Sequence, residues 1–358
     1  MVWDINLLLT KALDLKASDL HLAVTYPPML RIRGELKPIA GLSSLTPSDI
    51  EEILCILIDD EARQSFYRNK ELDFSYSLPG LARFRVNASF QRGSVSLSLR
   101  PVTVTIPSLE QLGLPEVCKE LAVRPHGLVL VTGPTGSGKS TTLAAMIDYL
   151  NQKTSQRIIT IEDPIEFFHQ SQRSMIIQRE LGSDTLSFAS ALRYVLRQDP
   201  DIILIGELRD LETIAIALTA AETGHLVLST VHSSGAIRAV ERIIDIFPAE
   251  RQSMVRYQLS MVLEGIIFQL LLPRADGQGR VAAVEVLVGT TAVHNLIRQN
   301  ELNQIKTYLH SGAEYGMQTI EQSLASLVKG GVITAADAMS RASDPENLEI
   351  LLGLREQH

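Results

Sequence analysis

The stretch Leu-Val-Leu-Val-Thr-Gly-Pro-Thr-Gly-Ser-Gly-Lys-Ser-Thr, residues 128–141, predicts the fold class of the chain. It contains the pattern G-x-x-x-x-G-K-[ST] in full, between an apolar β-rich run and a helical pattern over Lys139–Leu150. In this context the backbone N–H groups of the glycine-rich turn point at phosphate groups, and the helix N-terminus adds a positive dipole. The alternative, a chance glycine-rich turn, does not explain the strand before it and the helix after it.

The pattern assigns a role to the residues of this loop. Lys139 is expected to reach the β- and γ-phosphates of a nucleotide, and Ser140 is expected to ligate Mg²⁺. The predicted ATP-binding residues are therefore Gly133, Pro134, Thr135, Gly136, Ser137, Gly138, Lys139, Ser140 and Thr141.

Beyond Pro125, apolar β-rich runs alternate with helical patterns, which is typical of a parallel sheet with helices on its faces. The predicted strands are Leu128–Thr132, Ile158–Ile161, Ile202–Ile205 and Leu226–Thr230. From about Pro248 onward the pattern predicts helices, with one short strand at Val281–Leu287. The expected fold of this part is an α/β P-loop domain.

Polar side chains follow these strands at their carboxyl ends, where ligands bind in open α/β sheets. Glu207 stands in the Walker B position and is predicted to act on both Mg²⁺ and the attacking water. Glu162 and Glu166 are predicted to polarise water or hold Mg²⁺, with capping acids of a solvated loop as the alternative. His232 is predicted to sense the γ-phosphate. His225 lies at the start of its strand, where a structural role fits equally well.

The first hundred residues predict a smaller α/β domain. Its expected strands are Leu20–Val24, Met29–Ile39, Glu71–Leu78, Ala82–Phe90 and Ser94–Arg100, with a hairpin turn at Gln91-Arg92-Gly93. Thr46-Pro47-Ser48-Asp49 carries the capping and first-turn residues of a helix start. The proline-containing stretch 101–115 is predicted to be a linker, so the expected domains are residues 1–100 and 116–358.

The bulk composition disfavours several classes of protein. The 358-residue chain has a net charge of −8, which repels a phosphate backbone, so no nucleic-acid partner is expected. Its two cysteines, Cys55 and Cys118, make neither a disulfide framework nor a zinc motif and indicate a reducing compartment. The N-terminus lacks a signal-peptide pattern, and the longest apolar stretch, Gly265–Leu272, is far shorter than the ~20 residues of a membrane span. We expect a cytoplasmic protein without direct membrane insertion.

The motifs together resemble the secretion ATPase superfamily of type II secretion and type IV pili. The resemblance covers nearly the whole chain and rests on five segments. They correspond to the N-terminal signature (Ala17–Leu22), the Walker A box (Gly133–Thr141), the Asp box (Ile159–Glu166), the Walker B region (Asp199–Asp210) and the His box (Ala221–His232). It implies a RecA-like P-loop ATPase domain with a smaller N-terminal PAS-like domain. It also implies ATP and Mg²⁺ as cofactors and a homo-hexameric ring as the assembly.

Three features favour the pilus retraction branch of this superfamily. The chain begins almost at the N-terminal signature, two distant cysteines cannot form the four-cysteine zinc module of many relatives, and Ala292–Gln299 is similar to a segment of retraction ATPases. That segment departs from the family pattern at Val293, His294 and Gln299. The resemblance implies a motor that powers pilus retraction and twitching motility through an inner-membrane platform protein, to which it is peripheral.

Other functions stay open from the residues alone. The nearest alternative is an accessory retraction ATPase of the same family, followed by a pilus assembly or type II secretion ATPase. A RecA-like nucleic-acid translocase and a non-hydrolysing nucleotide-binding scaffold are more distant alternatives. Salt-dependent DNA binding tests for the translocase, and an ATPase assay tests for the non-hydrolysing scaffold.

Phosphoryl transfer needs positive charge at the γ-phosphate as its bond breaks. The resemblance implies that arginines of the N-terminal domain supply it from across the domain cleft, and the candidates are Arg83, Arg85, Arg92 and Arg100. Arg83 and Arg85 are two positions apart on one predicted strand, so they share a face. The alternative is a solvated strand face.

The segment Ala292–Gln299 has helical spacing. Val293, Leu296 and Ile297 fall on one face, which predicts contact with a core. Asn295 and Arg298 are expected on the outer face, because burying them unpaired is costly. Our hypothesis is that this outer face transmits motion or contacts the pilus machinery, and a core helix is the alternative.

Overall fold

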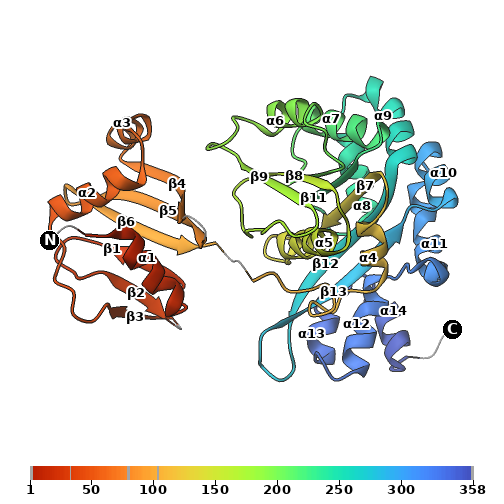
Figure 1. The fold of residues 1–358 in the computed structure, drawn as a ribbon. Coiled ribbons are helices and arrows are strands. Elements are labelled where there is room, and N and C mark those ends of the chain that lie inside the picture. Colours follow the sequence, from red (N-terminus) through yellow and green to blue (C-terminus); the bar gives the residue numbers. More distant parts are fainter. Residues whose placement is uncertain (1–2, 33, 79–80, 103–104, 356–358) are drawn as a thin grey trace. The chain divides into compact units, whose positions relative to one another are not determined.

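The computed structural model describes residues 3–32, 34–78, 81–102 and 105–355, which divide between two compact units (Figure 1). Unit 1 comprises residues 1–104 and 166–168, and unit 2 comprises residues 105–165 and 169–358. Each unit has its own hydrophobic core. The two units are therefore described separately.

The described part of unit 1 holds an antiparallel sheet of six strands in the order β3-β2-β1-β6-β5-β4. The strands are β1 (Asp19–Leu22), β2 (Met29–Ile32), β3 (Glu35–Pro38), β4 (Glu71–Leu78), β5 (Ala82–Gln91) and β6 (Ser94–Pro101). The helices are α1 (Ile5–Asp14), α2 (Pro47–Leu57) and α3 (Asp60–Asn69). Apolar side chains of α1, α2 and the sheet form the core of this unit.

The sequence patterns of unit 1 predicted some of these elements and missed others. The helix start at Thr46 is confirmed, because its side chain accepts the N–H of Asp49 and the Asp49 carboxylate accepts the N–H of Thr46. The hairpin turn after Gln91 is confirmed by the pairing of Gln91 with Ser94. The single predicted strand Met29–Ile39 is wrong: Gly34, at a φ of 87°, lies in a turn that folds β3 back onto β2. Helices α1 and α3 were not predicted.

The described part of unit 2 holds a sheet of seven strands in the order β13-β12-β7-β11-β10-β8-β9. Every neighbouring pair is parallel except β12 and β13. The strands are β7 (Gly127–Thr132), β8 (Arg157–Glu162), β9 (Met175–Glu180), β10 (Ile202–Ile205), β11 (Leu226–Val231), β12 (Leu263–Pro273) and β13 (Arg280–Val288). The central strands β7, β10 and β11 are buried along their whole length, as continuous apolar runs predict.

Helices follow β7, β9, β10 and β11 and form the remaining layers of unit 2 together with the C-terminal helices (Figure 1). They are α4 (Val117–Ala122), α5 (Lys139–Lys153), α6 (Phe188–Val195), α7 (Leu211–Glu222), α8 (Ala236–Asp245), α9 (Ala249–Val262), α10 (Thr291–Gln299), α11 (Ile305–Ser311), α12 (Ile320–Lys329), α13 (Ala335–Met339) and α14 (Pro345–Leu352). Two short 3₁₀ helices lie at Leu302–Gln304 and Gly312–Tyr315. Among the residues that the structure describes, no helix has the length and apolarity to cross a membrane.

Two expectations for unit 2 need correction. The region after Pro248 holds the strand predicted at Val281–Leu287, which is β13, and also a strand that was not predicted. Leu263–Pro273 forms β12, which pairs with β7 on one side and with β13 on the other. This run is apolar because it is buried between two strands, and a short apolar run by itself does not distinguish a strand from a helix. The second half of the predicted linker is also part of unit 2, since Leu109 and Leu114 are buried in its core.

Candidate nucleotide site

The glycine-rich loop joins β7 to α5 and has the backbone that phosphate binding requires. Gly133, Gly136 and Gly138 have φ values of 146°, 76° and 88°. A Cβ on Gly133 would lie 2.4 Å from the carbonyl oxygen of Gln269, so a larger residue does not fit there. Gly138 is the N-cap of α5 and has no side chain, which leaves the helix N-terminus available to an anion.

Lys139 is held inside this loop. Its side chain is buried, and its ammonium group donates to the carbonyl oxygens of Gly133 at 3.0 Å and Pro134 at 2.9 Å. These two bonds keep the Lys139 ammonium at the glycine-rich loop, where the motif predicts that phosphates bind.

Gln269 of β12 packs against the glycine-rich loop and the start of α5. The sequence patterns did not identify this residue. Its Oε1 accepts the hydroxyl of Thr142 at 2.7 Å, and its side chain is buried. Its Nε2 lies 2.8 Å from where a Cβ of Gly138 would be. A glutamine inside the apolar run Gly265–Leu272 is the one signal that could have found it, because a buried amide requires hydrogen-bond partners.

A pocket of about 240 Å³ opens beside the loop, where the helix α5 begins. It is lined by Gly138 and Thr141 of the loop, by Leu271 and Arg274, and by residues of the segment 110–113. Charged and amide side chains, among them Glu110, Gln111 and Arg280, line it together with apolar ones.

The parallel strands bring three of the predicted side chains and the glycine-rich loop to the same edge of the sheet. Moving along the sheet, β7 ends in the loop, β11 ends next to His232, β10 ends next to Glu207 and β8 ends in Glu162. Neighbouring strands lie about 4.8 Å apart, so the loop and Glu207 flank the end of β11. The glycine-rich loop and these three side chains therefore lie at the carboxyl ends of the strands, as the sequence predicts.

Hydrogen bonds from both neighbouring strands fix the backbone around Glu207. The N–H of Gly206 donates to the carbonyl of Ile161 at 2.8 Å, and the hydroxyl of Thr230 donates to the carbonyl of Gly206 at 2.7 Å. The N–H of Leu208 donates to the carbonyl of Thr230 at 2.9 Å. Glu207 thus leaves the strand on a rigid backbone, as a residue that orients water must.

The Glu207 carboxylate is 13% exposed and lies between two basic side chains. It forms an ion pair with Arg209, and its Oε2 is 3.5 Å from Nε2 of His232. The sequence patterns did not identify Arg209 as a neighbour of Glu207. The structure thus brings Glu207 and His232, which the sequence patterns singled out separately, next to each other.

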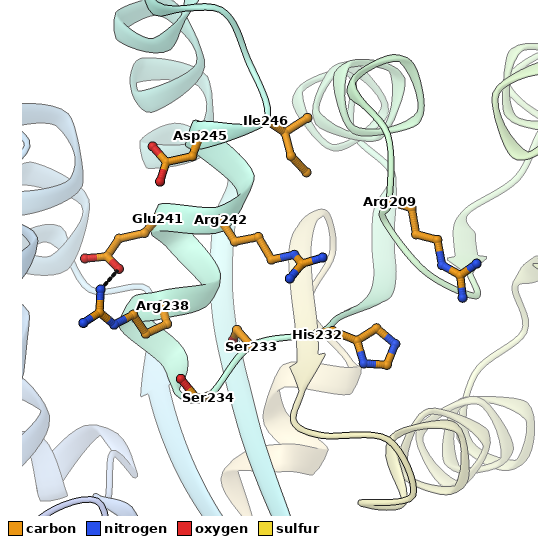
Figure 2. A pocket seen from close by; sticks show the side chains of 9 residues that line it. All are labelled: Arg209, His232, Ser233, Ser234, Arg238, Glu241, Arg242, Asp245 and Ile246. Carbon is orange, nitrogen blue, oxygen red and sulfur yellow. Dashed lines mark hydrogen bonds and ion pairs between the residues drawn. The ribbon is translucent and has the colours of Figure 1, made fainter.

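The surroundings of His232 favour the neutral form of its imidazole. Burial, followed by the positive charges of Lys139, Arg209 and Arg242, lowers the pKa of its imidazole below the ordinary value. A pocket of about 490 Å³ opens beside it, and Figure 2 shows His232, Arg209 and Arg242 around that space. Glu241 also lines the pocket and is bound by Arg238 at 2.7 Å.

Two acids follow β8 in different settings. Glu162 is half-buried, and its Oε1 accepts the hydroxyl of Thr160 at 2.6 Å and the amide of Gln178 at 3.1 Å. Glu166 is exposed in the loop that follows the strand. The structure places Glu162 at the edge of the sheet that carries the glycine-rich loop.

His225 lies at the opposite edge of the sheet from the glycine-rich loop. It precedes β11, and its Nδ1 is 3.0 Å from the carbonyl of Ala220 and 3.3 Å from the hydroxyl of Thr223. A six-residue strand spans roughly 20 Å. The structure therefore does not bring His225 together with Glu207 and His232, because strand polarity separates them.

The four predicted arginines all belong to unit 1. Arg83 and Arg85 lie on β5, and Arg92 lies in the turn between β5 and β6 with a φ of 49°. Arg100 lies opposite Arg85 in the register of β5 and β6, and its guanidinium binds the buried carboxylate of Asp19 at 2.8 Å. Arg85 and Arg100 thus present their charges on the exposed face of the sheet.

Ser140 and Glu207 have the oxygen donors that Mg²⁺ prefers. Ser140 is exposed in the first turn of α5, and Glu207 follows β10 at the same edge of the sheet. Among the described residues, no three His, Cys, Asp or Glu side chains gather into a metal site of their own.

The chain is similar to proteins of known kind along most of its length. Residues 81–340 match the family model described as type II/IV secretion system protein. The chain is 47% identical to the type IV pilus retraction ATPase PilT of Pseudomonas aeruginosa, over 96% of this chain and 99% of that protein. It is 48% identical to a twitching motility protein of Neisseria gonorrhoeae, over 96% of this chain and 91% of that protein. A crystal structure of the pilus retraction motor PilT with bound ADP superposes with a TM-score of 0.87, at 48% identity, over 97% of this chain and 99% of that one.

Proposed function

The chain belongs to the type II/IV secretion system protein family, and we propose that it is an ATP-hydrolysing motor that powers retraction of a type IV pilus. The observation that carries this proposal is the glycine-rich loop beside Glu207, in a chain that matches pilus retraction proteins along nearly its full length. The fold of unit 2 is that of a P-loop α/β ATPase. The relation of unit 1 to PAS domains stays a prediction.

The geometry supports a division of roles at the nucleotide. The loop N–H groups and Lys139 bind the phosphates, and Ser140 and Glu207 hold Mg²⁺, which neutralises charge on the β- and γ-phosphates when bound. Glu207 orients the attacking water and accepts its proton, and neutral His232 contacts the γ-phosphate. The pocket beside Thr141 receives the organic part of the nucleotide.

The mechanical part of the proposal rests on the relatives. We expect a homo-hexameric ring that acts on an inner-membrane platform protein of the pilus machinery, at the cytoplasmic side of that membrane. We expect cations of unit 1 to complete a nucleotide site that neighbouring subunits share, so specific activity should rise with protein concentration where the ring forms. Flat specific activity across that range, with ring formation followed by light scattering, would count against a shared site.

One experiment separates this proposal from its alternatives. A strain that lacks the protein is complemented with the wild type, with Lys139→Ala or with Lys153→Ala, an exposed lysine at the end of the same helix. We expect twitching motility with the wild type and Lys153→Ala, and none with Lys139→Ala. Twitching in the uncomplemented strain would identify an accessory ATPase. A purified protein without ATP turnover would instead be a scaffold, and turnover stimulated by DNA would indicate a translocase.

A further inference from the structure

Helix α8 begins directly after the loop that carries His232, and it has no capping side chain of its own because its N-cap is Gly235. Glu285 of β13 fills this role from another part of the chain. Its Oε1 accepts the backbone N–H of Ala236 at 2.8 Å. A carboxylate here satisfies an N–H of the first turn and interacts favourably with the positive end of the helix. Glu285 therefore ties the start of α8 to β13.

The same loop is tied to the strand that leads into the phosphate-binding loop. Thr132 is the last residue of β7, and its Oγ1 accepts the N–H of Ser233 at 3.1 Å. The hydroxyl of Ser233 donates to the carbonyl of Gly235 at 2.8 Å. The loop that carries His232 is thus held by β7 on one side and by Glu285 on the other.

β13 is in turn bound to the start of α12 on both sides of Glu285. The N–H of Val286 donates to the carbonyl of Gln318 at 2.9 Å. The N–H of Val284 donates to the hydroxyl of Ser323 at 3.0 Å. A shift of α12 along β13 would therefore displace the backbone of β13 on both sides of Glu285.

The surroundings of Glu285 come from three elements. Burial raises its pKa, and the nearby Glu321 carboxylate of α12 raises it further, while the N–H groups of Ala236 and Ile320 and the charge of Lys306 lower it. Glu285 therefore stands between the N-termini of α8 and α12 and is not an ordinary surface acid.

We propose that Glu285 is a positioning residue for ATP hydrolysis, which holds the His232 loop in register with the C-terminal helices. It acts through the N–H of Ala236 and does not touch the nucleotide. Its removal leaves the phosphate-binding loop intact and frees the start of α8, so the distance between His232 and Glu207 is no longer fixed. The inference rests on the proposed ATPase function and names a further residue that this function requires.

The test compares variants of the full-length protein for ATP turnover, ATP affinity and thermal stability. Glu285→Leu removes both acceptors at similar volume, and we expect a loss of about tenfold to a hundredfold in kcat, the size seen for small displacements of catalytic groups. The KM for ATP should stay within about threefold, because the phosphate contacts are untouched. Glu285→Gln keeps an acceptor oxygen at the same reach and should keep most of the turnover. Glu285→Asp keeps the charge but shortens the reach, so it should lose turnover even if Glu285→Leu does not fold.

The control is Glu321→Leu. Glu321 is also a buried acid of this region, but it accepts the N–H groups of Ser343 at 3.1 Å and Asp344 at 2.9 Å and does not bind α8. We expect it to lower the melting temperature without lowering kcat. The proposal is overturned if Glu285→Asp turns over ATP like the wild type, or if the losses in both positions simply follow the loss of stability. A wild-type protein without turnover would refute the ATPase function itself, which is a different outcome.

Discussion

The two sheets of this protein use their strands in opposite ways. In the sheet of unit 2 the neighbouring parallel strands β7, β11, β10 and β8 all end at one edge, and the polar residues that follow them meet there. In the sheet of unit 1 every strand reverses the one before it, so polar residues spread over an exposed face instead. In this protein the parallel order gathers polar side chains at one edge of a sheet, whereas the antiparallel order distributes them over a face.

The sharpest challenge to this comparison is the double variant Arg83→Ala with Arg85→Ala. If the face of unit 1 supplies charge to the γ-phosphate, kcat should fall by about 10³-fold, the lower end of what a catalytic arginine contributes. ATP binding, measured with a fluorescent nucleotide, should change little. Arg68→Ala, an exposed arginine of α3, is the control. Unchanged turnover in the double variant would leave all of the chemistry at the edge of the other sheet.

The edge of the parallel sheet is tested by Glu207→Gln. We expect kcat to fall by about 10²-fold, the usual contribution of a positioned base, while ATP binding persists because the glycine-rich loop is untouched. Glu212→Gln, an exposed acid at the start of α7, should have no such effect. Turnover close to the wild-type rate would show that Glu207 is not catalytic.

A smaller effect is expected from pH. The pKa of His232 is lowered by burial and by nearby cations, so its neutral form persists below the ordinary value of about 6.5. Turnover should therefore be flat from pH 8 to about pH 6.5 and fall below the pKa by about tenfold for each further pH unit. His232→Asn should lose this acid limb and keep a lower, flatter profile. A wild-type profile that already falls between pH 8 and 7 would contradict a neutral imidazole.

The smallest effect on chemistry is expected at α10, which follows β13 at the edge of the sheet opposite the glycine-rich loop. The buried face of α10 is confirmed, since Val293, Leu296 and Ile297 are buried in the core of unit 2. Asn295→Ala with Arg298→Ala should change stability by only about 1 kcal/mol. Both residues are exposed, and Arg298 lies over the ring of Tyr257 at 5.7 Å and donates to the hydroxyl of Ser260 at 3.5 Å.

The same double variant tests whether this surface transmits motion. ATP turnover of the purified protein should stay within about twofold of the wild type, because no described contact of Asn295 or Arg298 reaches the nucleotide site. Twitching motility of cells that carry the variant should be lost. Normal motility would contradict the idea that this surface transmits motion, and joint loss of turnover and assembly would make the helix purely structural.

Much of the site could be predicted because its parts are local in the chain. The glycine-rich loop needs neighbouring residues in a fixed order, and each core strand shows itself as an apolar run followed by a polar residue. The helix start at Thr46 was found for the same reason, since both partners of its capping box lie within four positions. Because these apolar runs do not alternate with polar residues, they predict strands that are buried on both faces, as in a parallel sheet.

The rest depended on contacts between segments that are distant in sequence. The sequence by itself determined the nucleotide chemistry, through the order of residues 133–140, and placed Glu207 and His232 at strand ends. Only the tertiary structure decided that Leu263–Pro273 is a strand and that Gln269 supports the loop. It likewise decided that Glu285 caps a helix 49 positions away in the chain. The physical reason is that burial and hydrogen bonding satisfy a polar group with whichever partner the fold brings near, and a one-dimensional pattern does not record that partner.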